Sequence, residues 1–362
     1  MRMKYILILL LALGSISCKK DPEPQPDPVP PPAVPTIPAM YYPPVSGTGW
    51  ETTNPSSLQW NTAELTNLYS YLQTKNTKAF IILKDGKIVT ERYFGTFTAD
   101  SIWYWASAGK TMTAMLEGLL NINNKTSQYL GNGWTSMPQA KEDLITIRHQ
   151  LTMSTGMENN VPDDDCTLPS CLQYRADAGT RWFYHNAPYT LLDKVVESAS
   201  GQTYNAYFQN KIRNRIGMNG FWFKTGYNNV YYSNALSMAR FGLLMLNKGK
   251  WDGTSILADS NYFNSQINTS QNLNLSYGYL TWLNGKSSHM LPATSLVFNG
   301  SITPNGPIDM YAALGKNDQK IYVVPSQRLV VIRMGESAGN VQLAVSSFDN
   351  ELWGKLKTII GY

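Results

Sequence analysis

Ser107 and Lys110 stand three positions apart at the start of an apolar stretch, a spacing suited to nucleophilic catalysis. A serine hydroxyl is a weak nucleophile until a base takes its proton, and a lysine is a base only while it is neutral. Burial and the positive field at a helix N-terminus both lower a lysine pKa from its usual ~10.4. Because side chains three apart share one helical face, the pair predicts an activated serine. A capped surface helix is the structural alternative for an isolated Ser-x-x-Lys.

The segment Ser107–Thr111 (SAGKT) also ends like a phosphate-binding P-loop. That loop needs a glycine five residues before its second glycine, where the backbone turns tightly around phosphate. Here the position is Tyr104, flanked by Trp103 and Trp105. The sequence therefore excludes nucleotide binding by this segment.

A second polar group, Tyr184-His185-Asn186, follows about 75 residues downstream. In an extended segment Tyr184 and Asn186 point to one side and His185 to the other. A phenol near Lys110 relays a proton to a leaving group, and an asparagine amide binds both the lysine and a substrate carbonyl. A core tyrosine and a helix N-cap are the structural alternatives. His185 as the base of a Ser/His/Asp triad is disfavoured, because the Gly-x-Ser-x-Gly pattern is absent.

Both groups, in this order, resemble the serine β-lactamase/penicillin-binding-protein-like family, and most closely its class C, esterase and 6-aminohexanoate-dimer-hydrolase branch. Three further segments are similar to the usual sequence of that family: TIRHQLTMSTGM (146–157), SMARFGLLMLNKGKWDGTSIL (237–257) and SYGYLTW (276–282). The resemblance covers residues 56–362. It implies that Ser107 is the acylated nucleophile, Lys110 its general base, Tyr184 the second acid/base, and Asn186 the residue that positions substrate and Lys110.

The family's third motif, Lys-Thr-Gly or His-x-Gly on a strand edge, matches Ala313–Lys316 (ALGK). The resemblance implies that Gly315 lets substrate approach the backbone and that the Lys316 N–H joins the Ser107 N–H as an oxyanion donor. A plain strand-to-turn glycine is the alternative. Ala313 replaces the cationic lysine of the antibiotic-handling members, which disfavours efficient β-lactam hydrolysis and D-Ala-D-Ala transpeptidation. Strand alternation predicts that the Lys316 side chain points away from the Ser107 pocket.

Cys166 and Cys171 frame a short loop that we expect to form one wall of the cleft. In an exported domain they favour a disulfide, whose role in so short a loop is local rigidity. The adjacent Asp163–Asp165 run is expected to be a solvated acidic loop, in preference to a contact with a cationic substrate or a metal site.

The N-terminus indicates export. Residues 1–17 combine a basic start with an apolar run too short to span a bilayer, as in a signal peptide. Small residues before Cys18 resemble a bacterial lipobox, which implies lipidation of Cys18; an ordinary secretory leader is the alternative. Residues 18–49 are predicted to be a tether, since 11 of the 20 prolines lie in residues 21–44. We expect a lipid-anchored protein in the bacterial cell envelope.

The composition and charge of the chain limit the classes of partner and cofactor that we expect it to bind. Of 362 residues, 43% are hydrophobic and 15% charged, which suits a folded domain rather than a disordered chain. The formal net charge is +5, and loss of Arg2 and Lys4 with the leader would remove two positive charges. The rest of the chain contains no dense run of lysine and arginine. Nucleic acid is therefore not an expected partner. The three Cys and three His lack zinc-ligand spacing, so neither metal nor cofactor is predicted.

Residues 50–362 are predicted to be one mixed α/β domain. Expected helices span 63–74, 107–122, 188–200, 236–247 and 341–359. Expected strands lie in 79–95, with a hairpin turn at Asp85-Gly86, and at 310–314, 320–324 and 329–334. This order predicts an antiparallel sheet built from both chain ends plus a helical lobe, with a cleft between them. The resemblance implies the β-lactamase/transpeptidase-like fold.

The sequence thus favours an exported serine hydrolase that cleaves a small-molecule or peptide amide or ester through an acyl-enzyme on Ser107. Alternatives are a D-Ala-type carboxypeptidase or weak β-lactamase, and a non-catalytic tethered module that binds cell wall. The presence of Ser107, Lys110 and Tyr184 together argues against the non-catalytic module.

Overall fold

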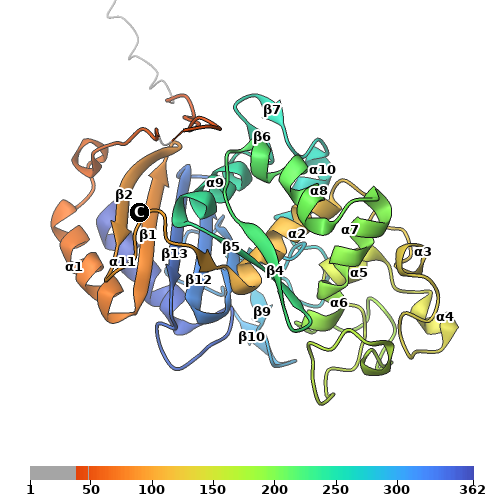
Figure 1. The fold of residues 1–362 in the computed structure, drawn as a ribbon. Helices are drawn as coiled ribbons and strands as arrows, with labels where there is room; N and C mark the ends of the chain where they lie inside the picture. The colour runs from red at the N-terminus through yellow and green to blue at the C-terminus, as the bar shows by residue number, and fades with distance from the viewer. Residues whose placement is uncertain (1–37, 48) are drawn as a thin grey trace, which may run out of the picture. The chain divides into compact units, whose positions relative to one another are not determined.

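A six-stranded antiparallel sheet brings together strands from both ends of the chain (Figure 1). Its strands, in spatial order, are β2 (Lys87–Tyr93), β1 (Thr77–Lys84), β13 (Leu329–Gly335), β12 (Gln319–Val324), β11 (Tyr311–Gly315) and β8 (Trp282–Leu283). The first strands of the domain therefore pair with its last, as β1 does with β13 from Thr77↔Gly335 to Lys84↔Leu329. The prediction of an antiparallel sheet built from both ends of the chain is confirmed.

The computed structural model describes residues 38–47 and 49–362, so the expected leader, Cys18 and most of the tether lie outside the described residues. The folded unit begins at Ala39, earlier than the expected boundary at residue 50. The Tyr41 N–H donates to the Asp85 carbonyl at 3.0 Å, and Arg240 Nη2 donates to the Pro44 carbonyl at 2.8 Å. A proline lacks a donor but keeps its carbonyl, and Arg240 uses those carbonyls to hold this segment.

Both faces of the sheet are covered, which explains why β12 and β13 are buried along their whole length. On one face, Lys320 of β12 donates to Asp349 of α11 (Ser347–Ile360) at 3.0 Å. On the other face, α9 (Ala235–Leu246) comes so close that a Cβ on Gly242 would lie 2.5 Å from Val330. Helix α1 (Thr62–Thr74) lies beside α11 (Figure 1), where Tyr71 stacks on Phe348 at 6.2 Å between ring centroids.

The β1–β2 turn follows its sequence signature. Asp85 and Gly86 both adopt positive φ, 54° and 83°, as the two central residues of a type I′ hairpin do. A Cβ on Gly86 would lie 1.9 Å from the Tyr41 carbonyl oxygen, so only glycine fits beneath the N-terminal segment.

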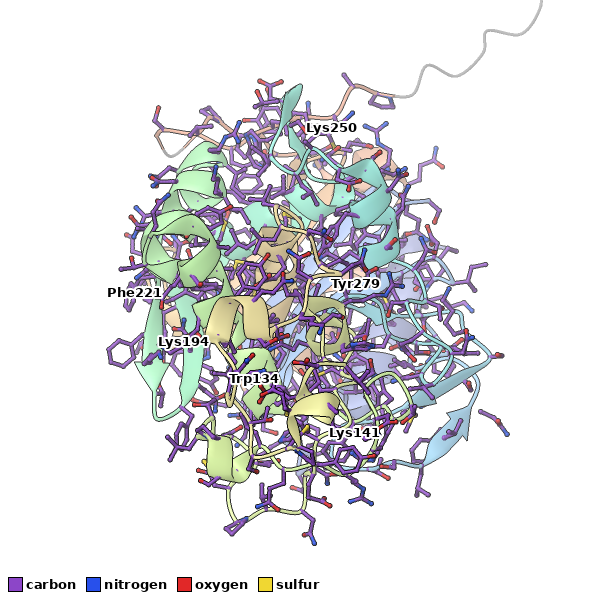
Figure 2. The ribbon with its side chains drawn as sticks, turned by 90° about the vertical axis from the view of Figure 1, so that its right-hand side faces the viewer. Trp134, Lys141, Lys194, Phe221, Lys250 and Tyr279 are labelled. Carbon is purple, nitrogen blue, oxygen red and sulfur yellow. A yellow bond between two sulfur atoms is a disulfide. The ribbon has the colours of Figure 1, made fainter. Side chains whose placement is uncertain are left out.

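The helical lobe lies on the other side of α2 from the sheet (Figure 1). Its helices are α3 (Ser127–Leu130), α4 (Gln139–Glu142), α5 (Ile147–Leu151), α6 (Asn186–Thr190), α7 (Leu192–Ser200), α8 (Tyr204–Lys211) and α10 (Ser260–Gln266). A smaller core in this lobe, separate from the main one, includes Trp134 (Figure 2), Met157 and Leu172. Short hairpins complete the chain: β6 (Lys250–Trp251) with β7 (Thr254–Ser255), and β9 (Ser288–Met290) with β10 (Val297–Asn299).

Three predicted helices differ in their bounds. The expected helix 107–122 is a 3₁₀ turn, η2 (Ala106–Gly109), followed by α2 (Lys110–Glu117), which is buried on every side. It ends at Gly118, where a Cβ would lie 2.5 Å from the Tyr262 ring. The expected helix 188–200 is divided into α6 and α7, and α11 begins six residues later than expected because Ser346 caps it.

The sequence analysis missed a second, three-stranded sheet of β3 (Trp103–Tyr104), β5 (Asn228–Ser233) and β4 (Phe221–Thr225). Phe221 projects from its surface and is 45% exposed (Figure 2). The signal was present, since FWFKT and NNVYYS are separated by Gly226-Tyr227, a hairpin-length turn. Among the described residues, no helix has the length and apolar character needed to cross a bilayer.

Candidate active site

Ser107 and Lys110 meet because the chain around them is a 3₁₀ turn. In this geometry the side chains of residues i and i+3 eclipse one another, more directly than in an α-helix. Lys110 Nζ donates to Ser107 Oγ at 2.9 Å. The preceding residue, Ala106, has φ 48°, a left-handed conformation that costs a non-glycine residue about 1–3 kcal/mol. The surrounding packing holds this strained turn, and with it the serine, in place.

Lys110 is 5% exposed, and burial lowers its pKa to about 7. Two aromatic rings face its Nζ, that of Tyr189 at 4.2 Å and that of Tyr184 at 5.4 Å from the centroid. These rings and the Asp165 carboxylate favour the charged form, but desolvation outweighs them. Near neutral pH a large fraction of Lys110 is therefore a neutral amine, able to take the Ser107 proton.

Tyr184 is fixed by aromatic packing behind Lys110. Its ring stacks on Trp282 at 5.6 Å and contacts Tyr277 edge-on at 6.2 Å. Burial raises its pKa, and the interaction with the Ser107 side chain only partly offsets that rise. A phenolate at neutral pH is thus disfavoured. Tyr184 suits the role of a proton carrier rather than that of the base.

The segments that resembled the family surround these residues. In SYGYLTW, Tyr277 and Trp282 pack on Tyr184, and the Leu280 carbonyl accepts from Thr111 Oγ1 of α2 at 2.7 Å. In TIRHQLTMSTGM, the Met153 carbonyl accepts from the N–H of Phe183 at 3.0 Å. These segments therefore fix the positions of Tyr184 and α2.

Gly315, at the end of β11, lies against the nucleophile turn. A Cβ at this position would lie 2.5 Å from the Trp105 carbonyl oxygen, 2.9 Å from Ala108 N and 3.1 Å from Ser107 N. A Cβ essentially never comes closer than 3.0 Å to another heavy atom. The expected reason for this glycine was access for substrate; the structure adds that only glycine lets β11 close on the backbone of Ser107.

A cavity of about 290 Å³ opens beside Ser107. Ala106, Ser107 and Lys110 form one wall, Asn186 and Tyr189 of α6 another, and the β4–β5 hairpin a third. Lys316 lines it as well. The expectation that its side chain points away relied on strand alternation, and β11 ends at Gly315, where Lys316 opens a 3₁₀ turn, η5 (Lys316–Asp318).

Asn186 reaches this cavity but hydrogen-bonds a partner that the sequence did not suggest. Its Nδ2 donates to Asp165 Oδ1 at 2.8 Å, and no hydrogen bond joins it to Lys110 within the described chain. Asn228 Nδ2 of β5 donates to the other oxygen, Asp165 Oδ2, at 2.7 Å. Asp165, expected to belong to a solvated loop, is therefore a cavity residue. Asn228 was missed together with its hairpin.

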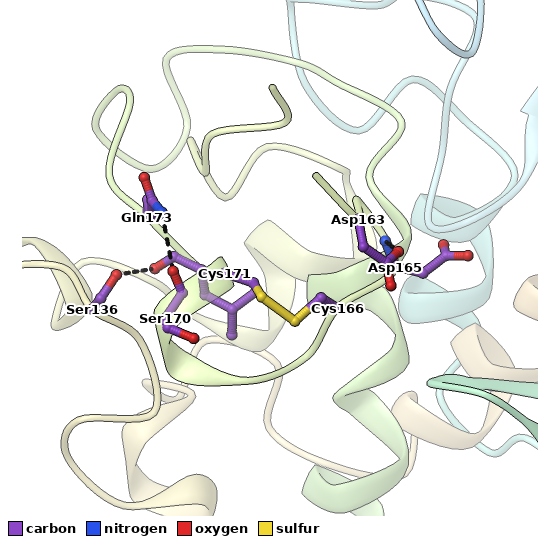
Figure 3. The surroundings of a disulfide bond; sticks show 8 residues. Ser136, Asp163, Asp165, Cys166, Ser170, Cys171 and Gln173 are labelled. Atoms are coloured by element: carbon purple, nitrogen blue, oxygen red, sulfur yellow. Dashed lines mark hydrogen bonds between the residues drawn. A yellow bond between two sulfur atoms is a disulfide. The ribbon is translucent and has the colours of Figure 1, made fainter. Parts of the chain in front are cut away.

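The disulfide loop supplies Asp165. Cys166 and Cys171 are joined by a disulfide whose Cα atoms lie 5.9 Å apart, and Asp165 immediately precedes it (Figure 3). Oxygens of Asp163, Asp164 and Asp165 lie within 4.8 Å of one another. Asp163 and Asp164 are exposed, in keeping with the solvated loop that was expected for the whole run.

His185 and the nearby tryptophans stand outside the cavity. Burial and the neighbouring Arg181 lower the pKa of His185 to about 4, and in residues 38–47 and 49–362 no hydrogen bond joins it to Ser107. Trp105 and Trp182 are 0% and 1% exposed and belong to the core. The cavity thus brings together Ser107, Lys110, Asn186 and Lys316, with Tyr184 and Gly315 packed behind them.

Solved structures share this fold at low sequence identity. A protein of Bacteroides dorei DSM 17855 assigned as a β-lactamase is 16% identical, with a TM-score of 0.65 over 84% of this chain and 100% of that one. A Bacillus anthracis protein assigned as a 6-aminohexanoate-dimer hydrolase is 16% identical, with a TM-score of 0.64 over 89% and 90%. The octameric penicillin-binding protein homologue of Pyrococcus abyssi is 16% identical, with a TM-score of 0.59 over 83% and 77%.

No curated protein matches the chain. The family model described as Beta-lactamase matches residues 74–348, a range that contains the nucleophile turn, Tyr184, the disulfide loop and the Gly315 strand. The fold, an antiparallel sheet from both chain ends beside a helical lobe, agrees with that match. The chain belongs to the Beta-lactamase family.

Proposed function

We propose that this protein is a serine hydrolase that cleaves an amide or ester bond through an acyl-enzyme on Ser107. The observation that carries the proposal is the contact between Lys110 Nζ and Ser107 Oγ at 2.9 Å, in surroundings that lower the pKa of Lys110 to about 7. A buried lysine with such a pKa has the basicity that suits proton transfer near neutral pH.

In the first half-reaction, neutral Lys110 accepts the proton of Ser107 as Oγ forms a bond to the substrate carbonyl carbon. The carbonyl oxygen becomes an oxyanion, and the N–H groups of Ser107 and Lys316 are the candidate donors to it. Collapse of this intermediate breaks the bond to the leaving group, which takes a proton from Lys110 by way of the Tyr184 hydroxyl. The acyl group remains on Ser107.

In the second half-reaction, water replaces the leaving group. Its proton passes to Tyr184 and Lys110 as its oxygen attacks the acyl carbon, and Ser107 leaves with that proton restored. The product is a carboxylic acid. No step uses a metal or a cofactor.

The proposal is tested by intact mass of residues 39–362 after reaction with a fluorophosphonate. The wild type and Ser170→Ala, a control at an exposed serine of the disulfide loop, are expected to gain one adduct, and Ser107→Ala none. No adduct on any of the three would overturn the hydrolase and favour a non-catalytic binding module. An adduct that persists in Ser107→Ala would identify a different serine.

A D-Ala-type carboxypeptidase or weak β-lactamase is the second candidate. Lys316 favours it, because a cation in the cavity suits a substrate carboxylate, whereas Ala313 lacks the cation that the antibiotic-handling relatives carry at that position. A stable penicilloyl adduct on Ser107, absent from Lys316→Met, would support this candidate over a general amidase or esterase.

We also propose that the protein is exported and anchored by a lipid on Cys18, and that the proline-rich segment holds the domain away from the membrane. The leader-like residues 1–17 and the small residues before Cys18 support this location.

A further inference from the structure

The candidate oxyanion donor at Lys316 stands in a tight connection between two strands. Gly315, the last residue of β11, pairs with Gln319, the first residue of β12. The strands are therefore joined by the three residues of η5, in which Asn317 and Asp318 have φ 58° and 57°. This left-handed conformation costs a non-glycine residue free energy, so other contacts must hold it. Because so short a loop has few alternative conformations, a change of φ at Asp318 would also redirect the Lys316 N–H.

The carboxylate of Asp318 is fixed on three sides. It is 1% exposed, and its Oδ1 accepts from Ser346 Oγ at 2.6 Å while its Oδ2 accepts from the Ala338 N–H at 2.9 Å. Lys320 Nζ lies 3.2 Å from Oδ1. Burial acts to raise the pKa of Asp318, but the Lys320 ammonium and these hydrogen bonds together lower it below its usual value. The side chain is thus an ionised, fully partnered anchor.

Arg333 of β13 holds the backbone of the same turn. This residue is 0% exposed, and its Nη1 donates to the carbonyl of Asp318 at 2.8 Å and to that of Asn317 at 3.3 Å. Its Nη2 donates to the carbonyls of Lys75 at 2.6 Å and Glu336 at 2.9 Å. The planar guanidinium presents its donors in fixed directions, so it ties η5 to the neighbouring strands. The Asp318 carboxylate is one of the negative charges that favour this buried cation.

These contacts lie outside the cavity. Lys316 lines the cavity wall, whereas Asp318 does not. We propose that Asp318 is a positioning residue for the oxyanion site: it holds η5 in its left-handed conformation and so aims the Lys316 N–H at the oxyanion. This role rests on the hydrolase function proposed above, because the oxyanion forms in that reaction. A donor stabilises the oxyanion only when it points to the place where the charge develops, so a small rotation of the loop lowers the rate.

The test compares the wild type, Asp318→Asn and Asp318→Ala, as residues 39–362, in the hydrolysis of 4-nitrophenyl acetate. Asparagine tolerates a left-handed conformation and keeps one acceptor oxygen, whereas alanine has neither property. The kcat per serine that a fluorophosphonate labels is expected to fall about 10-fold in Asp318→Asn and about 100-fold in Asp318→Ala. KM is expected to change by less than about threefold. Both half-reactions form an oxyanion, so kcat falls whichever of them is slower.

Expressing kcat per labelled serine removes the contribution of unfolded molecules, so a loss of stability alone leaves it unchanged. Wild-type kcat in Asp318→Ala would assign the buried charges to stability and overturn the proposal. If Asp318→Ala does not fold, wild-type kcat in Asp318→Asn overturns it in the same way. The pH midpoint of kcat/KM should stay near 7 in Asp318→Asn, since Lys110 is not its contact. A moved midpoint would show that the variant acts through the base instead.

Asp309→Ala is the matched control. Its carboxylate also accepts from one backbone N–H and one serine hydroxyl, both of Ser326, at 2.7 Å and 2.9 Å. It precedes β11, at the opposite end of that strand from η5. Asp309→Ala is expected to keep the kcat of the wild type. An equal loss of kcat in Asp309→Ala and Asp318→Ala would contradict a role that is specific to η5.

A second measurement compares a tetrahedral ligand with a planar one. Butylboronic acid bonds through boron to Ser107 Oγ, and the serine proton passes to Lys110, so the adduct resembles the tetrahedral intermediate. Its affinity, measured as protection of Ser107 from the fluorophosphonate, is expected to weaken in Asp318→Asn by about 10-fold, as kcat does. Protection by planar butanamide is expected to change by less than about threefold. Equal weakening of both compounds contradicts the proposal.

Fluorophosphonate labelling separates the two proposals. A wild type whose Ser107 is not labelled refutes the hydrolase. A wild type that is labelled, together with Asp318 variants that keep its kcat and its affinity for butylboronic acid, refutes only the positioning role.

Discussion

Asp165 and Lys110 line the same cavity, and the carboxylate of Asp165 opposes the fall in pKa that burial imposes on Lys110. Asp165 thus adjusts the base from another wall of the same cavity. Desolvation remains the larger influence on Lys110, because the pKa settles at about 7 in spite of the nearby negative charge.

The first prediction concerns the pH profile. Only neutral Lys110 accepts the Ser107 proton, so kcat/KM on an uncharged ester should rise with pH through an apparent pKa near 7 and level off above it. Asp165→Asn removes an influence that raises the Lys110 pKa, so the rise should move to lower pH. Asp163→Asn, measured in parallel, should leave the profile in place. A shift of the Asp165→Asn profile to higher pH would contradict the proposed base.

The second prediction concerns stability. Folding buries Lys110 and lowers its pKa to about 7, below its value in the unfolded chain, so between these two values folding must release a proton. Lys110→Met should therefore abolish activity yet increase the free energy of unfolding at pH 7 by about 2–4 kcal/mol. The increase should shrink as the pH rises toward 10, where the unfolded chain is also deprotonated.

Urea unfolding at pH 7 and at pH 9.5 measures this effect. Lys194→Met, at an exposed position of α7 (Figure 2), is the control and should change stability by under about 0.5 kcal/mol. A destabilised Lys110→Met at pH 7 would show that the lysine contributes more through packing than its desolvation costs.

The third prediction concerns Gly315. Gly315→Ala introduces a Cβ 2.5 Å from the Trp105 carbonyl and 3.1 Å from Ser107 N, so the nucleophile turn must shift. Such overpacking costs about 1–3 kcal/mol of stability, and misplacement of the serine should lower kcat by about 100-fold. Gly339→Ala, where a Cβ meets nothing within 4 Å, should leave both unchanged. Steady-state kinetics and thermal unfolding of the two variants provide the measurement. A Gly315→Ala variant with the kcat of the wild type would refute the claim that only glycine lets β11 pack against the backbone of Ser107.

The fourth prediction concerns the disulfide. The double variant Cys166→Ser/Cys171→Ser removes the disulfide beside Asp165. Because that disulfide closes a short loop, its loss should lower the free energy of unfolding by at most about 2 kcal/mol. Freeing Asp165 should weaken the interaction that raises the Lys110 pKa, so the rise of kcat/KM with pH on an uncharged ester should move to lower pH. Steady-state kinetics across the pH range provide the measurement. An unchanged profile would indicate that the loop holds Asp165 in place without the disulfide.

The fifth prediction concerns Cys18. Bacteria that express the full chain in the presence of radiolabelled palmitate should incorporate label into the wild type and into Cys166→Ser, but not into Cys18→Ser. The unlabelled variant should lose its association with membranes. Label that persists in Cys18→Ser would exclude this cysteine as the anchor and support an ordinary secretory leader.

The sequence by itself determined the strands of the main sheet and the proximity of Ser107 to Lys110. The hairpin at Asp85-Gly86 and the three C-terminal strands were predictable because their signals are local: residues that favour a turn, and short apolar runs that are rich in Val and Ile in the last two strands. Ser107 and Lys110 were predictable as a pair because three residues of one turn fix their distance whatever the rest of the chain does. The family resemblance assigned roles to Tyr184 and Asn186 and added Gly315.

Only the tertiary structure decided the partners of these residues and the character of the cavity. Asp165 and Asn228 are 63 positions apart, and their hydrogen bond depends on how a disulfide loop meets a hairpin. The pKa of Lys110 depends on burial by residues from distant segments, and the need for glycine at position 315 depends on a backbone more than 200 residues away. A local pattern specifies a turn or a strand; which charges share a cavity is set by packing between segments that the pattern does not connect.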